Sequence, residues 1–306
     1  MENKYFNDAI IGNGNIAASF SKKGELLRLF YPNTDYRQFL DFMLTGVKVN
    51  DSNIIYLNND INNSYKQYYT EGTNILNTEV FNSYFKLNIV QTDFVPMSKN
   101  ILIKRYKFEN KNDIDLNVSF ILYSKLLTDV NNQVSGFCQN NVLKQYMHDY
   151  TFTVFSNQNM SSYQINSTKE NIETGVIGGK DYIGLSPDSS VSYDMSVIKP
   201  GESKVLDIFV YIKENDAKNS LEEIDNEIQE MMKLDAKKEF DSTKRYWHKY
   251  LKDHSTLDLE KFALVPNVKK IYDRTILLFP LLVNSLFPIC VVPLKYPPTI
   301  ISPSVV

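Results

Sequence analysis

The sequence predicts a mainly β protein with helices at its C-terminal end: a large antiparallel β-sandwich followed by helical segments. Aromatic residues make up 13% of the 306 residues, with 20 Tyr and 18 Phe, which favours strands. Apolar and polar side chains alternate through most of the first 212 residues, and the apolar spacing becomes helical after Ile212. The contents of hydrophobic residues (43%) and charged residues (23%) are those of a folded chain.

The clearest strand covers residues 114–122, where every second residue from Ile114 to Leu122 is apolar and would lie on one core face. The segments that start at Phe85 and Tyr150 alternate in the same way. Residues 205–212 are apolar on both faces, which predicts a strand covered on both sides. Turns rich in Asn and Gly separate these segments without intervening helices, so we expect antiparallel sheets stacked face to face.

Three helices are expected after the strands. Ser220 and Glu223 have the spacing of a capping box at the start of the first helix. The second helix is predicted from Asp235 to Lys252, with Phe240, Trp247 and Leu251 on one stripe. The third would begin near Pro266, and Pro280 should end or kink it. These changes predict a sandwich domain over 1–213, linker helices over 214–265, a further helix over 266–284 and an atypical tail over 285–306.

The third helix and the tail are unusual. The helix has apolar side chains on more than one face, at Ile271, Leu277 and Leu282, which is typical of a helix buried by neighbouring helices. If no neighbours cover it, its surface should promote association. The tail is so dense in proline that it can form neither a helix nor a central strand. This composition suggests a changed reading frame or a wrong terminus in the source sequence.

Composition excludes several function classes. The net charge of −3 argues against a nucleic-acid binder that works through a bulk basic field. The two cysteines, Cys138 and Cys290, provide no disulfide framework. Together with the three histidines, His148, His248 and His254, they do not have the spacing of metal ligands. The N-terminus has no apolar signal sequence and no segment is long and apolar enough to span a membrane, so we expect a cytoplasmic protein. No catalytic residue, cofactor-binding residue, cofactor or metal ligand is assigned.

A few motifs invite a functional interpretation. The segment from Gly12 to Ala17 fits G-x-G-x-x-A, but no βαβ unit follows it, so a hairpin turn is favoured over a nucleotide site. Arg105 could contact a ligand, although a strand arginine paired with a carboxylate is the more common case. Trp247, the single Trp, could stack on a sugar but better fits a core or domain-interface anchor, with His248 beside it at the surface or interface. Residues 65–69 are expected to form a core or edge strand, and no pair of carboxylates stands out.

Several segments together resemble the N-terminal part of bacterial and archaeal glucoamylase-type proteins, glycoside hydrolase family 15. The resemblance covers about residues 8–284 and rests on Ile11-Gly12-Asn13-Gly14-Asn15-Ile16, Gly24-Glu25-Leu26 running to Phe30-Tyr31-Pro32, Thr92-Asp93-Phe94-Val95-Pro96, Lys199-Pro200-Gly201-Glu202-Ser203, Tyr246-Trp247 and Tyr272-Asp273-Arg274-Thr275. It implies a sandwich, a pair of linker helices and an (α/α)6 catalytic barrel. It also implies release of glucose from the non-reducing ends of α-1,4-glucans, by inversion and without a cofactor.

The resemblance ends near Asn284, where family members enter the barrel that carries their catalytic glutamates. We therefore expect a chain truncated at the start of the barrel and inactive alone. Two alternatives remain open: a stand-alone module that binds α-glucan, maltooligosaccharide or another protein, and the N-terminal part of a maltose-phosphorylase-like protein. Neither a nucleic acid nor a membrane is expected as a partner.

Overall fold

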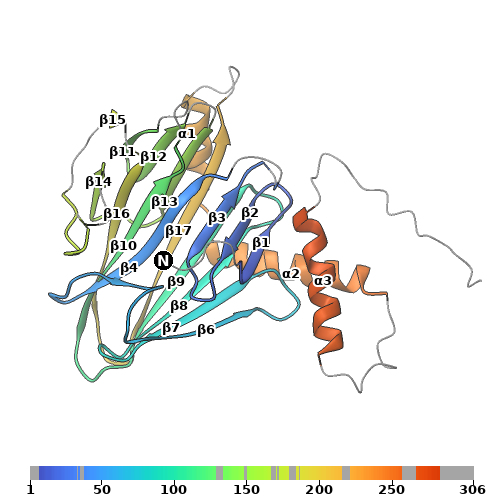
Figure 1. The fold of residues 1–306 in the computed structure, drawn as a ribbon, viewed down its shortest axis with the longest axis horizontal. Helices are drawn as coiled ribbons and strands as arrows, with labels where there is room; N and C mark the ends of the chain where they lie inside the picture. The colour runs from blue at the N-terminus through green and yellow to red at the C-terminus, as the bar shows by residue number, and fades with distance from the viewer. Residues whose placement is uncertain are drawn as a thin grey trace, which may run out of the picture.

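The computed structural model describes residues 7–32, 34, 38–128, 134–147, 150–166, 170, 172–178, 184–185, 187–215, 221–256 and 267–282. Several residues named in the sequence predictions lie outside these ranges, namely His148, Ser220, Pro266, Asn284, Cys290 and the tail over 285–306. The described residues form two antiparallel sheets, followed by helices α1 (Leu221–Met231), α2 (Ala236–His254) and α3 (Val268–Leu282). Figure 1 shows the strands first in the chain and the helices last, which confirms the predicted fold class.

The two sheets contain eight and nine strands within the described residues. The first runs in the spatial order β1 (Ala9–Gly12), β2 (Ala17–Phe20), β3 (Leu26–Phe30), β4 (Leu40–Val49), β10 (Leu116–Leu126), β16 (Asp188–Ile198) and β14 (Ser162–Ile165), with β5 (Ile55–Tyr56) paired to β4. The second runs β15 (Gly184–Leu185), β11 (Ser135–Gln139), β12 (Val142–Met147), β13 (Tyr150–Ser156), β17 (Ser203–Glu214), β9 (Ile101–Asn110), β8 (Leu87–Phe94), β7 (Leu76–Asn82) and β6 (Asn63–Tyr69). β1 and β6 are thus edge strands.

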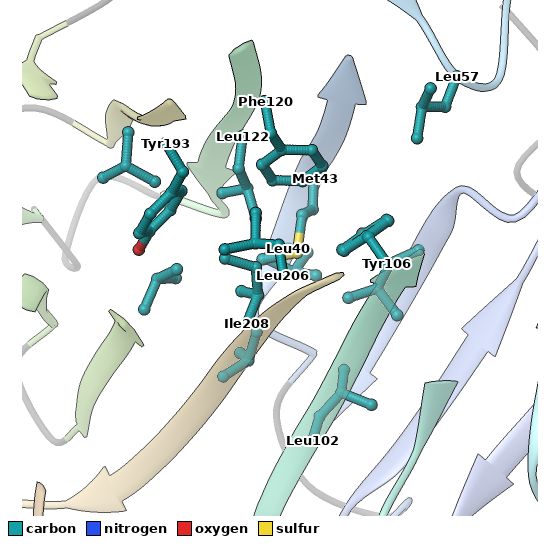
Figure 2. Close-up of a cluster of buried hydrophobic side chains, with 14 of the residues drawn as sticks. Leu40, Met43, Leu57, Leu102, Tyr106, Phe120, Leu122, Tyr193, Leu206 and Ile208 are labelled. Carbon is teal, nitrogen blue, oxygen red and sulfur yellow. The ribbon is translucent and has the colours of Figure 1, made fainter. Parts of the chain in front are cut away.

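The main core lies between the inner faces of the sheets. Figure 2 shows Leu40 and Met43 of the first sheet close to Leu206 and Ile208 of the second. These side chains are buried because each strand directs every second residue inward. Burial of each such side chain favours folding by about 1.5–3 kcal/mol, so the alternating pattern is enough to hold the two sheets together.

A second core covers the outer face of the nine-stranded sheet. Phe209 and Tyr211 of β17 pack there against Ile224 and Ile228 of α1. This arrangement confirms the prediction that residues 205–212 form a strand covered on both sides. Helix α2 then begins at its N-cap Asp235, whose side chain accepts hydrogen bonds from the next turn.

The structure corrects two local predictions and narrows a third, that Pro280 ends or kinks the last helix. Ile114 precedes β10 and is 58% exposed, because the turn before the strand takes it off the inward-facing row. Phe85 likewise lies in the turn before β8, which begins at Leu87. Helix α3 continues through Pro280 to Leu282, so this proline does not end it. Only two helical residues follow Pro280, and the helix loses a single backbone hydrogen bond there.

Candidate functional site

The two edge strands β1 and β6 meet at one corner of the sandwich. An edge strand exposes backbone N–H and C=O groups that need partners. At Ile10 of β1 both groups are satisfied by the hydroxyl of Tyr69 on β6, which accepts from the Ile10 nitrogen at 2.9 Å and donates to the Ile10 oxygen at 3.0 Å. Tyr69 therefore links the edges of the two sheets.

Arg274 of α3 closes this corner from outside. Its guanidinium carbon lies 3.5 Å from the centroid of the Tyr69 ring. One guanidinium nitrogen donates to the Ile10 carbonyl at 3.0 Å and another to the side-chain oxygen of Asn74. The Asn74 amide in turn donates to the Leu277 carbonyl at 2.5 Å. Burial lowers the pKa of Arg274, which nevertheless stays cationic at neutral pH.

An apolar cluster lies beside this polar contact, between α2 and α3. Trp247 of α2 has no exposed surface and packs with Leu277 and Leu281 of α3. Ile10 and Met97 of the sandwich complete the contact. The sequence predicted a core or domain-interface anchor, and Trp247 is a buried anchor in the cluster that joins α2, α3 and the sandwich. Polar and apolar contacts together hold α3 against the sandwich; Figure 1 shows α3 beside β1 and across α2.

Helix α2 is attached to the sandwich through the turn between β6 and β7. The Nε2 atom of His248 lies 3.0 Å from the Glu71 carbonyl oxygen. The next residue, Gly72, has a φ of 65°, and a Cβ atom there would approach the His248 ring to 3.2 Å. The positive φ favours glycine at this position, and the absence of a Cβ atom leaves room for the His248 ring. The sequence predicted a surface or interface histidine, and His248 is exposed to solvent while its ring contacts the Glu71 carbonyl.

Two carboxylates of the sandwich, Asp93 and Asp207, are bound to cations of neighbouring strands. Asp93 is completely buried and accepts from Lys104 at 2.6 Å and from Gln91 at 2.7 Å. Burial raises the pKa of Asp93 above its ordinary value, and the lowering effect of Lys104 and Gln91 offsets this only in part. Asp207 pairs with Arg105 at 3.3 Å, and burial raises its pKa as well. These ion pairs join neighbouring strands, which is a structural role.

The remaining predicted candidates have structural roles too. Gly12 to Ala17 forms the hairpin turn between β1 and β2, where Asn13 accepts from the backbone nitrogens of Asn15 and Ile16. Residues 65–69 lie in the edge strand β6. Cys138 is buried, and the His254 ring stacks on Tyr250 with 4.0 Å between centroids.

The sequence did not reveal Arg274 as the link between α3 and the sandwich. Its partners lie far away along the chain, 264 residues for Ile10 and 200 for Asn74. A single signal was available: Arg274 is the last charged residue before the uncharged, mostly apolar end of the helix, residues 275–282. In the described part of the chain, no cluster of three or more His, Cys, Asp or Glu residues could hold a metal ion. None of the helices in the described ranges is both long and apolar enough to cross a lipid bilayer.

Comparison with known proteins adds one relative by sequence. No protein-family model matches the chain. Over 212 residues the chain is 30% identical to the uncharacterized glycosyl hydrolase MJ1610 of Methanocaldococcus jannaschii, an alignment that covers 66% of this chain and 33% of that protein. The chain therefore spans about a third of the length of this curated relative.

Solved structures share the fold. A bacterial glucoamylase complexed with acarbose matches with a TM-score of 0.69 at 14% identity, over 90% of this chain and 40% of the glucoamylase. A candidate kojibiose phosphorylase from the human microbiome matches with a TM-score of 0.57 at 14% identity, over 79% of this chain and 35% of that chain. The chain is thus similar in sequence to a glycosyl hydrolase, and its β-sandwich with C-terminal helices has the fold of part of a bacterial glucoamylase.

Proposed function

We propose that this chain is part of a family 15 glycoside hydrolase of the glucoamylase type, which releases glucose from the non-reducing ends of α-1,4-glucans by inversion. In this proposal the sandwich, α1 and α2 form the support, and α3 is the first helix of an (α/α)6 catalytic barrel. The similarity to a glycosyl hydrolase and the fold shared with a glucoamylase support it. The described residues contribute rigidity rather than bond cleavage, and no cofactor takes part.

The observation that carries this proposal is the two-faced environment of α3. On one face, Leu277 and Leu281 are buried against Trp247, and Arg274 is bound to both sheet edges. On the other, Ile271 is 64% exposed and Phe279 is 58% exposed. A helix apolar on both sides is typical of one enclosed by neighbours. Further barrel helices would supply that cover.

Catalysis by inversion explains why a firmly held first helix would matter. It needs a carboxylic acid at the leaving oxygen and a carboxylate about 6.5–9.5 Å away to activate water. Misplacement of such groups by about 1 Å can cost about 100-fold in rate. The carboxylates of buried Asp93 and partly buried Asp207 are each engaged in an ion pair with a cation of the neighbouring strand. The sandwich is therefore better suited to support than to hydrolysis.

Two experiments test the proposal. The purified 306-residue chain should release no glucose from maltose or maltotetraose. Detectable release would contradict the proposal that the catalytic residues lie outside this chain. The DNA downstream of codon 284 should encode further amphipathic helices in one of its three frames. A chain extended by that frame should release glucose from maltotetraose first as the β-anomer, which proton NMR detects. First release of the α-anomer would contradict inversion.

A second candidate activity is that of a sugar phosphorylase, because a kojibiose phosphorylase structure shares the fold. Phosphate would then replace water as the nucleophile. The same extended chain distinguishes the two activities: a hydrolase forms free glucose with or without phosphate, whereas a phosphorylase forms glucose 1-phosphate only when phosphate is present.

A further inference from the structure

A cleft of about 310 Å³ lies on the outer face of the nine-stranded sheet, where α1 packs beside β11 and β12. Its apolar wall is formed by Val142 of β12 and Ile228 of α1, which belong to the outer core. Figure 1 shows α1 and β12 together at one end of the sandwich, away from α3. The cleft is therefore separate from the site that holds α3.

Polar side chains surround this apolar wall. Three residues with side-chain amides line the cleft and are exposed to solvent: Gln139, Asn140 and Gln229. Asn140 has a φ of 53° in the tight turn between β11 and β12, which brings Gln139 and Asn140 to the rim. A side-chain amide offers two donors and an acceptor, so each can bind two hydroxyl groups of one ligand.

A fixed charged pair forms another side of the cleft. The Lys144 side chain is 6% exposed and its ammonium group donates to Asp225, whose side chain is 49% exposed. The lysine is thus held in place, while the carboxylate of Asp225 keeps acceptor capacity on the solvent side. A carboxylate beside an ammonium group binds a hydroxyl well, because the hydrogen bond is charge-assisted.

An aromatic surface continues from this pair. The Lys144 ammonium lies 5.3 Å from the centroid of the Phe137 ring, which stacks on Tyr146 with 5.5 Å between centroids and 25° between planes. Phe137 lies opposite the lining residue Lys144 in the ladder between β11 and β12, so its ring borders the cleft on the Lys144 side, and Tyr146 lies behind it. Both rings are partly exposed.

We propose that this cleft binds one or two glucose units of an α-1,4-glucan without cleaving them. The hydroxyls of a pyranose ring would bond to Asp225 and the amides of Gln139 and Gln229, and an apolar C–H edge of the sugar would lie toward the partly exposed ring of Phe137 at the border of the cleft. The volume lies at the low end of the range for ligand sites, about 300–1,000 Å³, which suits a short segment rather than a long chain. The choice of an α-glucan as the sugar rests on the proposed function. The inference that the cleft binds a sugar rests on the residues of the cleft and not on that function.

Isothermal calorimetry of the full chain with maltotriose tests this inference. Titration to about 10 mM reaches millimolar affinities and should give saturable binding. Gln139→Ala combined with Gln229→Ala removes two exposed amides and should weaken binding at least tenfold, as should Phe137→Ala. Tyr84→Ala, which removes an aromatic ring that is 72% exposed between β7 and β8, is the matched control and should bind as wild type.

Circular dichroism melting curves establish that each variant folds before it is titrated. A flat titration of the wild-type chain would overturn the inference, and so would unchanged affinity in both cleft variants. These outcomes are distinguishable from failure of the proposed function, because binding here is measured without hydrolysis and the glucose-release experiment does not depend on the cleft.

Discussion

Replacement of Arg274 with alanine should release α3 from the corner where the two sheets meet. The guanidinium donates to Ile10 and Asn74 and lies over the ring of Tyr69. No other cation of α3 makes these contacts within the described residues, so truncation leaves the Asn74 oxygen without its partner. The Ile10 carbonyl still accepts from Tyr69, and the apolar contacts around Trp247 remain.

The expected magnitude follows from these contacts. Hydrogen bonds to charged groups contribute about 1.5–3 kcal/mol each, and a desolvated cation–π contact adds about 2 kcal/mol. Because Ile10 keeps one partner and such contributions are not additive, we expect a loss of about 2–4 kcal/mol in the free energy of α3 docking. This corresponds to a shift of about 30-fold to 700-fold toward the undocked helix.

Trp247 provides the assay. It is the single tryptophan of the chain and is fully buried between α2 and α3, so its fluorescence reports docking directly. Arg274→Ala should shift the emission to longer wavelength and increase quenching by acrylamide. Far-UV circular dichroism of the strands should be retained, because the sandwich core does not involve α3.

Two further variants make the experiment decisive. Lys270→Ala removes an exposed cation from the same helix and should leave emission and quenching unchanged. Arg274→Lys keeps the charge but loses the planar fork of donors, so we expect an intermediate effect. If Arg274→Ala behaves as Lys270→Ala does, the polar contacts do not hold α3 and the reasoning is refuted.

Three more predictions follow from the ion pairs and the exposed face of α3. Lys104→Met should lower the free energy of unfolding by about 3–5 kcal/mol in urea denaturation, because it leaves Asp93 buried without a counter-charge, whereas Lys104→Met with Asp93→Leu should cost much less. Burial raises the pKa of Glu227, but hydrogen bonds from Lys213 and Tyr211 outweigh it and leave the pKa below its ordinary value. This contribution to stability is present above the unfolded-state pKa of about 4.3 and is lost as pH falls through the folded-state pKa, so the advantage of wild type over Glu227→Gln in thermal melting should shrink below about pH 4.3. The exposed apolar face of α3 should make the chain self-associate in light scattering, and Ile271→Glu with Phe279→Glu should reduce the apparent mass.

Each of these three has an outcome that contradicts it. Equal destabilisation by the single and double variants would show that Lys104 acts through packing rather than through its charge. A constant difference between wild type and Glu227→Gln from pH 7 to pH 3 would mean that the pKa of Glu227 is not lowered on folding. A monodisperse monomer of the unaltered chain in light scattering would remove the basis for association through α3.

Much of the fold could be predicted because its determinants are local. Strand β13 follows from the alternation that starts at Tyr150, and helix α2 from the stripe that includes Phe240 and Trp247. The apolar faces of residues 205–212 even indicated that β17 has a layer on each side. Strand ends were less certain: the alternation continues through Ile114, whereas the chain turns there.

The candidate site is different in kind. Periodicity shows which side chains share a face, but it does not show which faces meet. Lys104 lies between the apolar Ile103 and the charged Arg105, and its role became visible only when the carboxylate of Asp93 on the neighbouring strand was placed 2.6 Å from its ammonium group in the core. The amides of Gln139 and Gln229 are separated in sequence and line one cleft only because α1 folds back over β12.

The sequence by itself determined that this protein is a β-sandwich followed by helices, because side-chain alternation along a strand and the hydrogen bonds within a helix depend on residues that are close along the chain. Only the tertiary structure decided how the sandwich is closed and where α3 is held. That corner joins Ile10, Tyr69 and Asn74 to Arg274, about 200 or more residues away. The energy of such a contact arises only once the sheets have packed and excluded water, and no local pattern records it.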